Sequence, residues 1–104
     1  MKRIGFKMKL KPGCREEYRK RHDHIWPDLK LLLKQHGISG YSIFHDHETD
    51  ILFAVQEVKG DSGSQDLGKN ELVQKWWEYM SDIMETNPDN SPVTTGLTEV
   101  FRLE

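Results

Sequence analysis

Residues 4–37 read IGFKMKLKPGCREEYRKRHDHIWPDLKLLLKQHG, and this stretch decides the fold because its hydrophobic period changes partway along. From residue 4 to residue 10 larger apolar side chains alternate with lysine or glycine, which predicts a strand with one buried face. After Pro12 and Gly13 the apolar residues recur every three or four positions, the spacing of an amphipathic helix. Pro27 interrupts that spacing, so we predict one helix that ends near Asp23 and a second that opens at Pro27 and is closed by Gly37.

The rest of the chain predicts three more strands and one more helix. Residues 41–44 and 51–58 are rich in aromatic and branched side chains and flank a polar segment, 45–50, as in a hairpin. Residues 59–70 lack any period and predict a loop, whereas apolar residues from 72 to 84 follow helical spacing. A second loop, 87–92, contains two prolines, and alternation from residue 97 to residue 103 predicts a last strand.

The predicted order is strand, two helices, strand, strand, helix, strand. This order describes an α+β domain over residues 1–104, a ferredoxin-like split β-α-β sandwich with its helices on one face of an antiparallel sheet. A chain this short buries a small core, and the second face of its sheet needs cover. We therefore expect a homodimer in which two sheets pack face to face as a dimeric α/β barrel.

Charge and cysteine content narrow the class of protein. Fifteen basic and seventeen acidic residues give a net charge of -2 and are mixed along the chain, which argues against a nucleic-acid partner. The lone Cys14 can form no disulfide within the chain and cannot complete a cysteine zinc site. Since no segment reads as a signal peptide or a membrane span, we expect a cytoplasmic protein without membrane contact.

His22 is the first candidate for chemistry. It shares a helical face with Tyr18, four residues earlier, so both side chains point toward a core or a cleft. The carboxyl end of a helix favours a protonated imidazole, which would make His22 an acid near neutral pH. A core histidine bonded to the backbone explains the same spacing equally well.

Aromatic residues are the candidates for ligand contacts. Trp76 and Trp77 are adjacent, so on a helix they diverge by about 100° and cannot both point to the centre of one core. An indole suits the apolar face of a sugar ring, but the pattern alone favours one tryptophan in the core and the other at a dimer interface. Tyr41 either donates a hydrogen bond to a ligand hydroxyl or simply lies at a sheet edge.

Other chemistries find little support in the sequence. The cluster His45, Asp46, His47, Glu48 and Asp50 falls in a predicted turn, where polar residues are expected for solvation, so we predict no metal. No serine elbow, phosphate loop or dinucleotide fingerprint is present, and we predict no cofactor. Proton transfer by positioned side chains is the chemistry that this residue set allows.

Several short motifs occur together along the whole chain: EEY at 16–18 before Arg21 and His22, IWP at 25–27, WW at 76–77 before Tyr79 and Met80, and NPDNSP at 87–92. With these motifs the sequence resembles the L-rhamnose mutarotase family from end to end. The resemblance implies a ferredoxin-like homodimer, without metal or cofactor, that interconverts the α and β anomers of L-rhamnose.

In terms of residues, the resemblance implies that His22 is the proton donor and that Tyr18, Tyr41, Trp76 and Trp77 bind the sugar. The group that accepts the proton stays open among a tyrosine, a loop carboxylate such as Asp89, and water. Two other functions also stay open. One is a sugar-binding module without catalysis that uses the same cleft, and the more remote one is a cofactor-independent oxygenase on the same fold.

Overall fold

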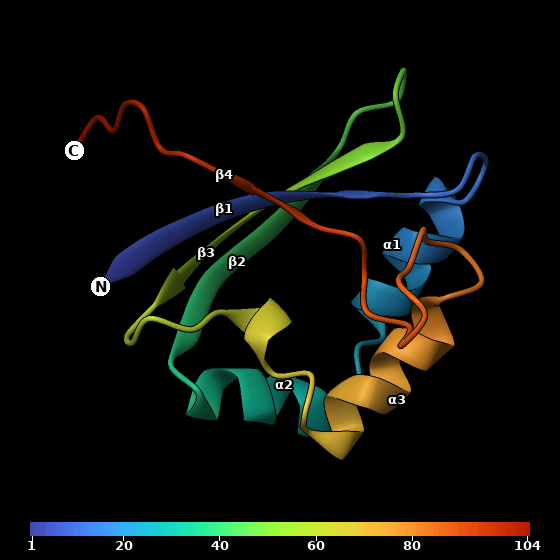
Figure 1. Cartoon of the computed structure of the whole chain (residues 1–104), viewed down its shortest axis with the longest axis horizontal. Coiled ribbons are helices and arrows are strands. Elements are labelled where there is room, and N and C mark those ends of the chain that lie inside the picture. Colours follow the sequence, from blue (N-terminus) through green and yellow to red (C-terminus); the bar gives the residue numbers. More distant parts are fainter.

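A computed structural model describes residues 1–104 as one sheet with helices on one side. The strands are β1 (Lys2–Lys9), β2 (Ile38–His45), β3 (Ile51–Val58) and β4 (Thr95–Leu97), and they form an antiparallel sheet in the order β2-β3-β1-β4. The helices are α1 (Arg15–Asp23), α2 (Pro27–Gln35) and α3 (Glu71–Met80), which all lie against the same face of the sheet (Figure 1). The opposite face carries no helix.

The alternation of β1 sets the core, as predicted. Phe6 and Met8 are buried toward the helices, and they pair with Ala54 and Leu52 of β3, which face the same way. Paired residues of neighbouring antiparallel strands share a face, so this register brings the inward side chains of both strands into one layer. The core is therefore the space between the sheet and the three helices, to which α3 adds its buried face.

The break at Pro27 is confirmed. α1 ends at Asp23 and α2 starts at Pro27, which stands at the first helical position, where its missing N–H costs nothing. Gly37 follows α2 with a φ of 78°, and a Cβ there would lie 2.9 Å from the Cβ of Lys59. Both the backbone angle and the close approach of Lys59 require glycine at this position.

The segment between β3 and α3 is predicted as a loop, but it contains a short 3-10 helix, η1 (Ser64–Asp66). The amide of Gly63 donates to the carboxylate of Asp66, and Ser64 is buried. Asn70 then caps α3, because its side chain accepts hydrogen bonds from the amides of Leu72 and Val73.

The prediction of a last strand over residues 97–103 is wrong in its extent. β4 is only Thr95–Leu97 and pairs with residues 5–7 of β1, and the residues after Leu97 form no strand. Val100, Phe101 and Leu103 are exposed, so their alternation does not correspond to a buried face of the sheet. α3 also stops at Met80, before the end of its apolar pattern, although Ile83 and Met84 are buried in the turns that follow.

No helix of the structure combines the length and the apolar character that crossing a bilayer requires.

Candidate active site

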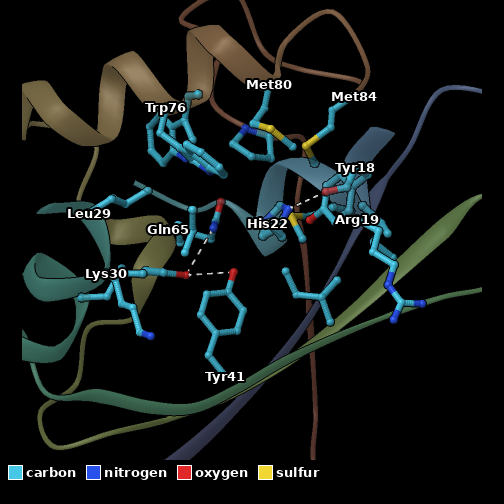
Figure 2. Close-up of a pocket in the computed structure, with 18 of the residues that line it drawn as sticks. Tyr18, Arg19, His22, Leu29, Lys30, Tyr41, Gln65, Trp76, Met80 and Met84 are labelled. Atoms are coloured by element: carbon cyan, nitrogen blue, oxygen red, sulfur yellow. Dashed lines mark hydrogen bonds between the residues drawn. The ribbon is translucent and has the colours of Figure 1, made fainter. Parts of the chain in front are cut away.

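A cleft of about 1200 Å³ lies between the inner face of the sheet and the helices. Residues of α1, α2, β2, η1 and α3 line it, and in Figure 2 Tyr41 rises from the sheet side while His22 and Trp76 come from the helices. The five residues singled out in the sequence all line this cleft, namely Tyr18, His22, Tyr41, Trp76 and Trp77. The fold thus brings together side chains that lie up to 59 positions apart, from Tyr18 to Trp77.

His22 is held on three sides. Its ring stacks on Tyr18 with centroids 4.3 Å apart, and it makes a T-shaped contact with Trp76, with centroids 5.4 Å apart and an interplanar angle of 88°. Its Nδ1 lies 3.0 Å from the backbone carbonyl oxygen of Tyr18, one turn earlier in α1. Stacking, edge contact and hydrogen bond together fix the position and the plane of the imidazole.

The hydrogen bond to Tyr18 also decides which ring nitrogen carries the proton. A carbonyl oxygen can only accept, so Nδ1 must donate and therefore holds the hydrogen. In the neutral ring Nε2 then has a free lone pair. His24 and His36 make the same bond to the carbonyl four residues earlier, at 3.0 Å each, but both of these rings are exposed.

The surroundings of His22 favour a neutral ring, against the expectation of an acid held protonated by the helix end. Burial lowers the pKa of His22 below its usual 6.5, and this effect outweighs the bond to the Tyr18 carbonyl and the nearby charge of Asp23, both of which raise the pKa. His22 is therefore neutral at neutral pH. The lone pair on Nε2 is then available to accept a proton.

Both tryptophans are buried, which differs from the expectation that only one could serve the core. Trp76 is 9% exposed and Trp77 is 7% exposed. They do diverge, because Trp76 turns to His22 and to the edge of Trp26, whose ring centroid is 5.1 Å away, whereas Trp77 packs against the backbone at Gly68. α3 buries a face wide enough for both directions, so neither indole is left for an interface.

Tyr18 and Tyr41 are protonated phenols in this site. Burial is the main cause that raises the pKa of Tyr18, with the nearby Tyr41 adding to it, and burial likewise raises the pKa of Tyr41. The ring of Tyr41 packs against Phe6 of β1, with centroids 6.4 Å apart. At neutral pH both hydroxyl groups can therefore donate a hydrogen bond.

This geometry can be compared with known proteins. A family model described as L-rhamnose mutarotase matches residues 3–103. The chain belongs to the L-rhamnose mutarotase family. It is 62% identical over 104 residues to the L-rhamnose mutarotase of Bacteroides thetaiotaomicron and 59% identical to that of Formosa agariphila, with complete coverage of all chains. A crystal structure of an L-rhamnose mutarotase from Formosa agariphila superposes with a TM-score of 0.92, at 56% identity and full coverage of both chains.

The family resemblance predicted from the sequence is thus confirmed, and the small α+β architecture agrees with that of a solved mutarotase.

Sequence reasoning missed a polar group at the edge of the mutarotase cleft. Gln56 and Ser64 are both buried, at 0% and 6% exposure, and are joined by two hydrogen bonds. One signal could have found the pair, because Gln56 is the single polar residue among the inward positions of β3, which are otherwise Leu52, Ala54 and Val58. A polar side chain in such a row needs a buried partner.

Three of the charged or titratable side chains at the β2–β3 turn, His45, Asp46 and Asp50, bond within the turn. His45 Nε2 lies 3.1 Å from Asp50 Oδ1, and Asp46 accepts from the Glu48 amide and the Thr49 hydroxyl. No group of three or more His, Cys, Asp or Glu side chains is arranged so that it could hold a metal ion. Asp89 accepts from Ser91 and does not line the cleft, which leaves it poorly placed as the proton acceptor.

Proposed function

We propose that the protein interconverts the α and β anomers of L-rhamnose by moving one proton through His22. The observation that carries this proposal is the lone pair of His22 Nε2, left free by the bond from Nδ1 to the Tyr18 carbonyl in a ring that is neutral and fixed among aromatic side chains. Membership of the L-rhamnose mutarotase family supports the choice of sugar.

In the proposed reaction the Nε2 lone pair takes the proton of the anomeric hydroxyl, O1–H. The electron pair of that bond forms the C1=O1 double bond while the C1–O5 bond breaks and its electrons stay on the ring oxygen, O5. The imidazolium then gives its proton to O5, which yields the open-chain aldehyde. Rotation about C1–C2 and the same steps in reverse give the other anomer.

One residue suffices for both transfers because O1 and O5 are bonded to the same carbon. His22 is then the proton donor to the ring oxygen, the role that the family resemblance implies, but only after it has acted as the acceptor. The hydroxyl group of Tyr41, kept protonated by its raised pKa, would donate a hydrogen bond to an oxygen that gains negative charge. Tyr18 would serve a sugar hydroxyl in the same way.

The tryptophans would supply the apolar part of the site. L-rhamnose carries a methyl group and an apolar ring face, which match an indole surface better than polar side chains do. Trp76 stands directly beside His22, and Trp77 lines the cleft one residue further along α3. This arrangement would hold the sugar with C1 near His22 Nε2.

The direct test is anomeric exchange of L-rhamnose measured by NMR saturation transfer with catalytic amounts of protein. We expect faster exchange with the wild type and a loss of about 10²-fold or more in a folded His22→Ala variant, the size of a general acid–base contribution. His36→Ala is the matched control, because His36 makes the same backbone bond but is exposed and does not line the cleft. Binding of L-rhamnose without faster exchange would instead favour a sugar-binding module.

A pH profile separates the two possible resting states of His22. A neutral acceptor loses activity as the pH falls through its pKa, so kcat/KM, corrected for spontaneous mutarotation, should be level near pH 7 and decline below pH 6.5. A protonated donor would lose activity as the pH rises. A decline on the alkaline side of neutrality would therefore overturn the proposed order of steps.

The same proposal includes a ferredoxin-like homodimer in the cytoplasm. The strand order β2-β3-β1-β4 with all helices on one face supports the ferredoxin-like assignment. The uncovered face of the sheet carries Phe44 and Phe53, a cross-strand pair that is 66% and 40% exposed, and Leu97. A second copy would cover these residues, so Phe44→Lys should shift a dimer toward monomer in analytical ultracentrifugation; a wild-type monomer would refute the dimer.

A further inference from the structure

We propose that Gln56 and Ser64 are positioning residues that aim the hydroxyl group of Tyr41 into the cleft as a hydrogen-bond donor. The proposal deepens the function given above and rests on it, since it assumes that the hydroxyl of Tyr41 serves the bound sugar. Neither residue needs to touch the sugar. They act by fixing where the hydroxyl hydrogens of Ser64 and Tyr41 point.

The backbone of Ser64 fixes the orientation of the Gln56 side-chain amide. The backbone N–H of Ser64 lies 2.8 Å from Gln56 Oε1, and since an N–H only donates, the oxygen of the amide must face it. The amide nitrogen Nε2 therefore faces Ser64 Oγ, at 2.9 Å. An NH₂ group also only donates, so the Ser64 oxygen accepts this bond.

The hydroxyl hydrogen of Ser64 is directed by the donors around its oxygen. Its oxygen also accepts from Gln65 Nε2, at 3.3 Å, so both of its lone pairs are engaged by N–H donors. The one remaining neighbour is the Tyr41 oxygen, 3.5 Å away, to which Ser64 donates. This contact is long for two hydroxyl groups, whose usual separation is about 2.7–2.8 Å, so it is the weakest bond of the set.

The hydroxyl hydrogen of Tyr41 is directed in turn by Ser64. Because its oxygen accepts from Ser64, its own hydrogen is left to point elsewhere. The ring rises from β2 with its hydroxyl end directed toward the helices (Figure 2), on the sheet side of the cleft that His22 enters from α1. These hydrogen bonds make the Tyr41 hydroxyl group a donor to the ligand, and His22 remains the group that accepts a proton.

Close packing around Gln56 holds these hydrogen bonds in place. Gln56 is fully buried in β3, and a Cβ on Gly63 would lie only 2.5 Å from Gln56 Oε1. The loop backbone therefore closes directly over the amide. Gln56 ties η1 to the sheet, and η1 in turn presents Ser64 to Tyr41.

The test is a double-mutant cycle of Ser64→Ala and Tyr41→Phe, read both as kcat/KM for anomeric exchange and as the dissociation constant of L-rhamnose from NMR titration. In the Tyr41 background Ser64→Ala should weaken both by up to about tenfold, the range of one hydrogen bond. In the Tyr41→Phe background the same change should have an effect below about twofold, because the group that it positions is gone. Ser64→Thr, which keeps the hydroxyl, should restore most of the loss.

A merely structural Ser64 would cause equal losses in both backgrounds, and that result overturns the proposal. Ser62→Ala is the matched control, since this serine lies in the same loop, is exposed and makes no side-chain hydrogen bond. If the wild type binds L-rhamnose without faster exchange, the mutarotase proposal fails, and the cycle in the dissociation constant alone decides the role of Ser64. If the wild type does not bind the sugar, both proposals fail.

Discussion

Arg21→Met should destabilise the protein by about 2–3 kcal/mol and lower its activity, although Arg21 does not line the cleft. The guanidinium bonds both carboxylate oxygens of Asp82, at 2.8 and 3.2 Å, as well as Glu17 at 2.8 Å and the backbone carbonyl of Tyr79 at 2.7 Å. It also lies 4.5 Å from the centroid of the Tyr79 ring. These contacts join α1 to the end of α3, the two helices that carry His22 and Trp76.

The magnitude follows from the exposure of the partners. Arg21 is 11% exposed, but Asp82 and Glu17 are 64% and 45% exposed and recover water when the guanidinium is removed. We therefore count about 1 kcal/mol for Asp82 and about 0.5 kcal/mol for Glu17, in the range of surface ion pairs. The carbonyl bond and the ring contact of Tyr79 add roughly 1 kcal/mol. For a domain of this size the total corresponds to a fall in Tm of roughly 10–15 °C.

The assay is urea unfolding of the wild type, Arg21→Met and Arg19→Met. Methionine keeps the apolar stem and removes only the charged fork. Arg19, 84% exposed with a single 4.0 Å contact to Asp23, is the matched control on the same helix and should change stability by less than about 0.5 kcal/mol. A loss below about 0.5 kcal/mol for Arg21→Met would refute the reasoning, because the Arg21 contacts would then be no stronger than exposed pairs.

Three further predictions concern single positions. Gly63→Ala should cost about 1–3 kcal/mol and weaken sugar binding, because its Cβ would lie 2.5 Å from Gln56 Oε1, whereas Gly60→Ala meets nothing within 4 Å and should have little effect; equal results in denaturation would contradict this. Asn70→Ala should destabilise by about 1 kcal/mol through loss of the α3 cap, measured as a shift in the urea midpoint, and an unchanged midpoint would show that water replaces the cap. The pKa of His22 is lower in the folded chain than in the unfolded chain, so the unfolded state binds more protons below pH 6.5; stability of the wild type relative to His22→Gln should fall as the pH drops below 6.5, and a rise would reverse the sign of the shift.

Much of the fold could be predicted because local chemistry and tertiary structure agree. Alternation in β1 and β3, the break at Pro27 and the end of α2 at Gly37 each depend on neighbouring residues, and each is present in the structure. The prediction of the last strand shares only Leu97 with β4, because alternation shows only that residues could pair. The ladder to β1 ends at Leu97, and the residues that follow do not continue along residues 2–4 of β1.

The sequence could predict which residues line the cleft, but it could not predict the protonation state of His22. Periodicity and family motifs identified residues that do line one cleft, but the protonation of His22 depends on how deeply the ring is buried, which a helical position does not state. The helix end favours the charged ring, and desolvation disfavours it more strongly here. The link from Gln56 to Ser64 spans eight residues and a change of structure, so it becomes visible only when the loop folds back on the sheet.

The hydrogen bond from Nδ1 to the carbonyl four residues earlier occurs three times in this chain, at His22, His24 and His36. His24 and His36 can therefore serve as internal references for His22. The three imidazoles share one tautomer and one kind of backbone partner, and they differ in burial, because His22 is half-buried whereas His24 and His36 are exposed. One titration of their ring C–H resonances would compare them in the same sample, and the difference between the His22 midpoint and the other two would measure how strongly burial disfavours a positive charge.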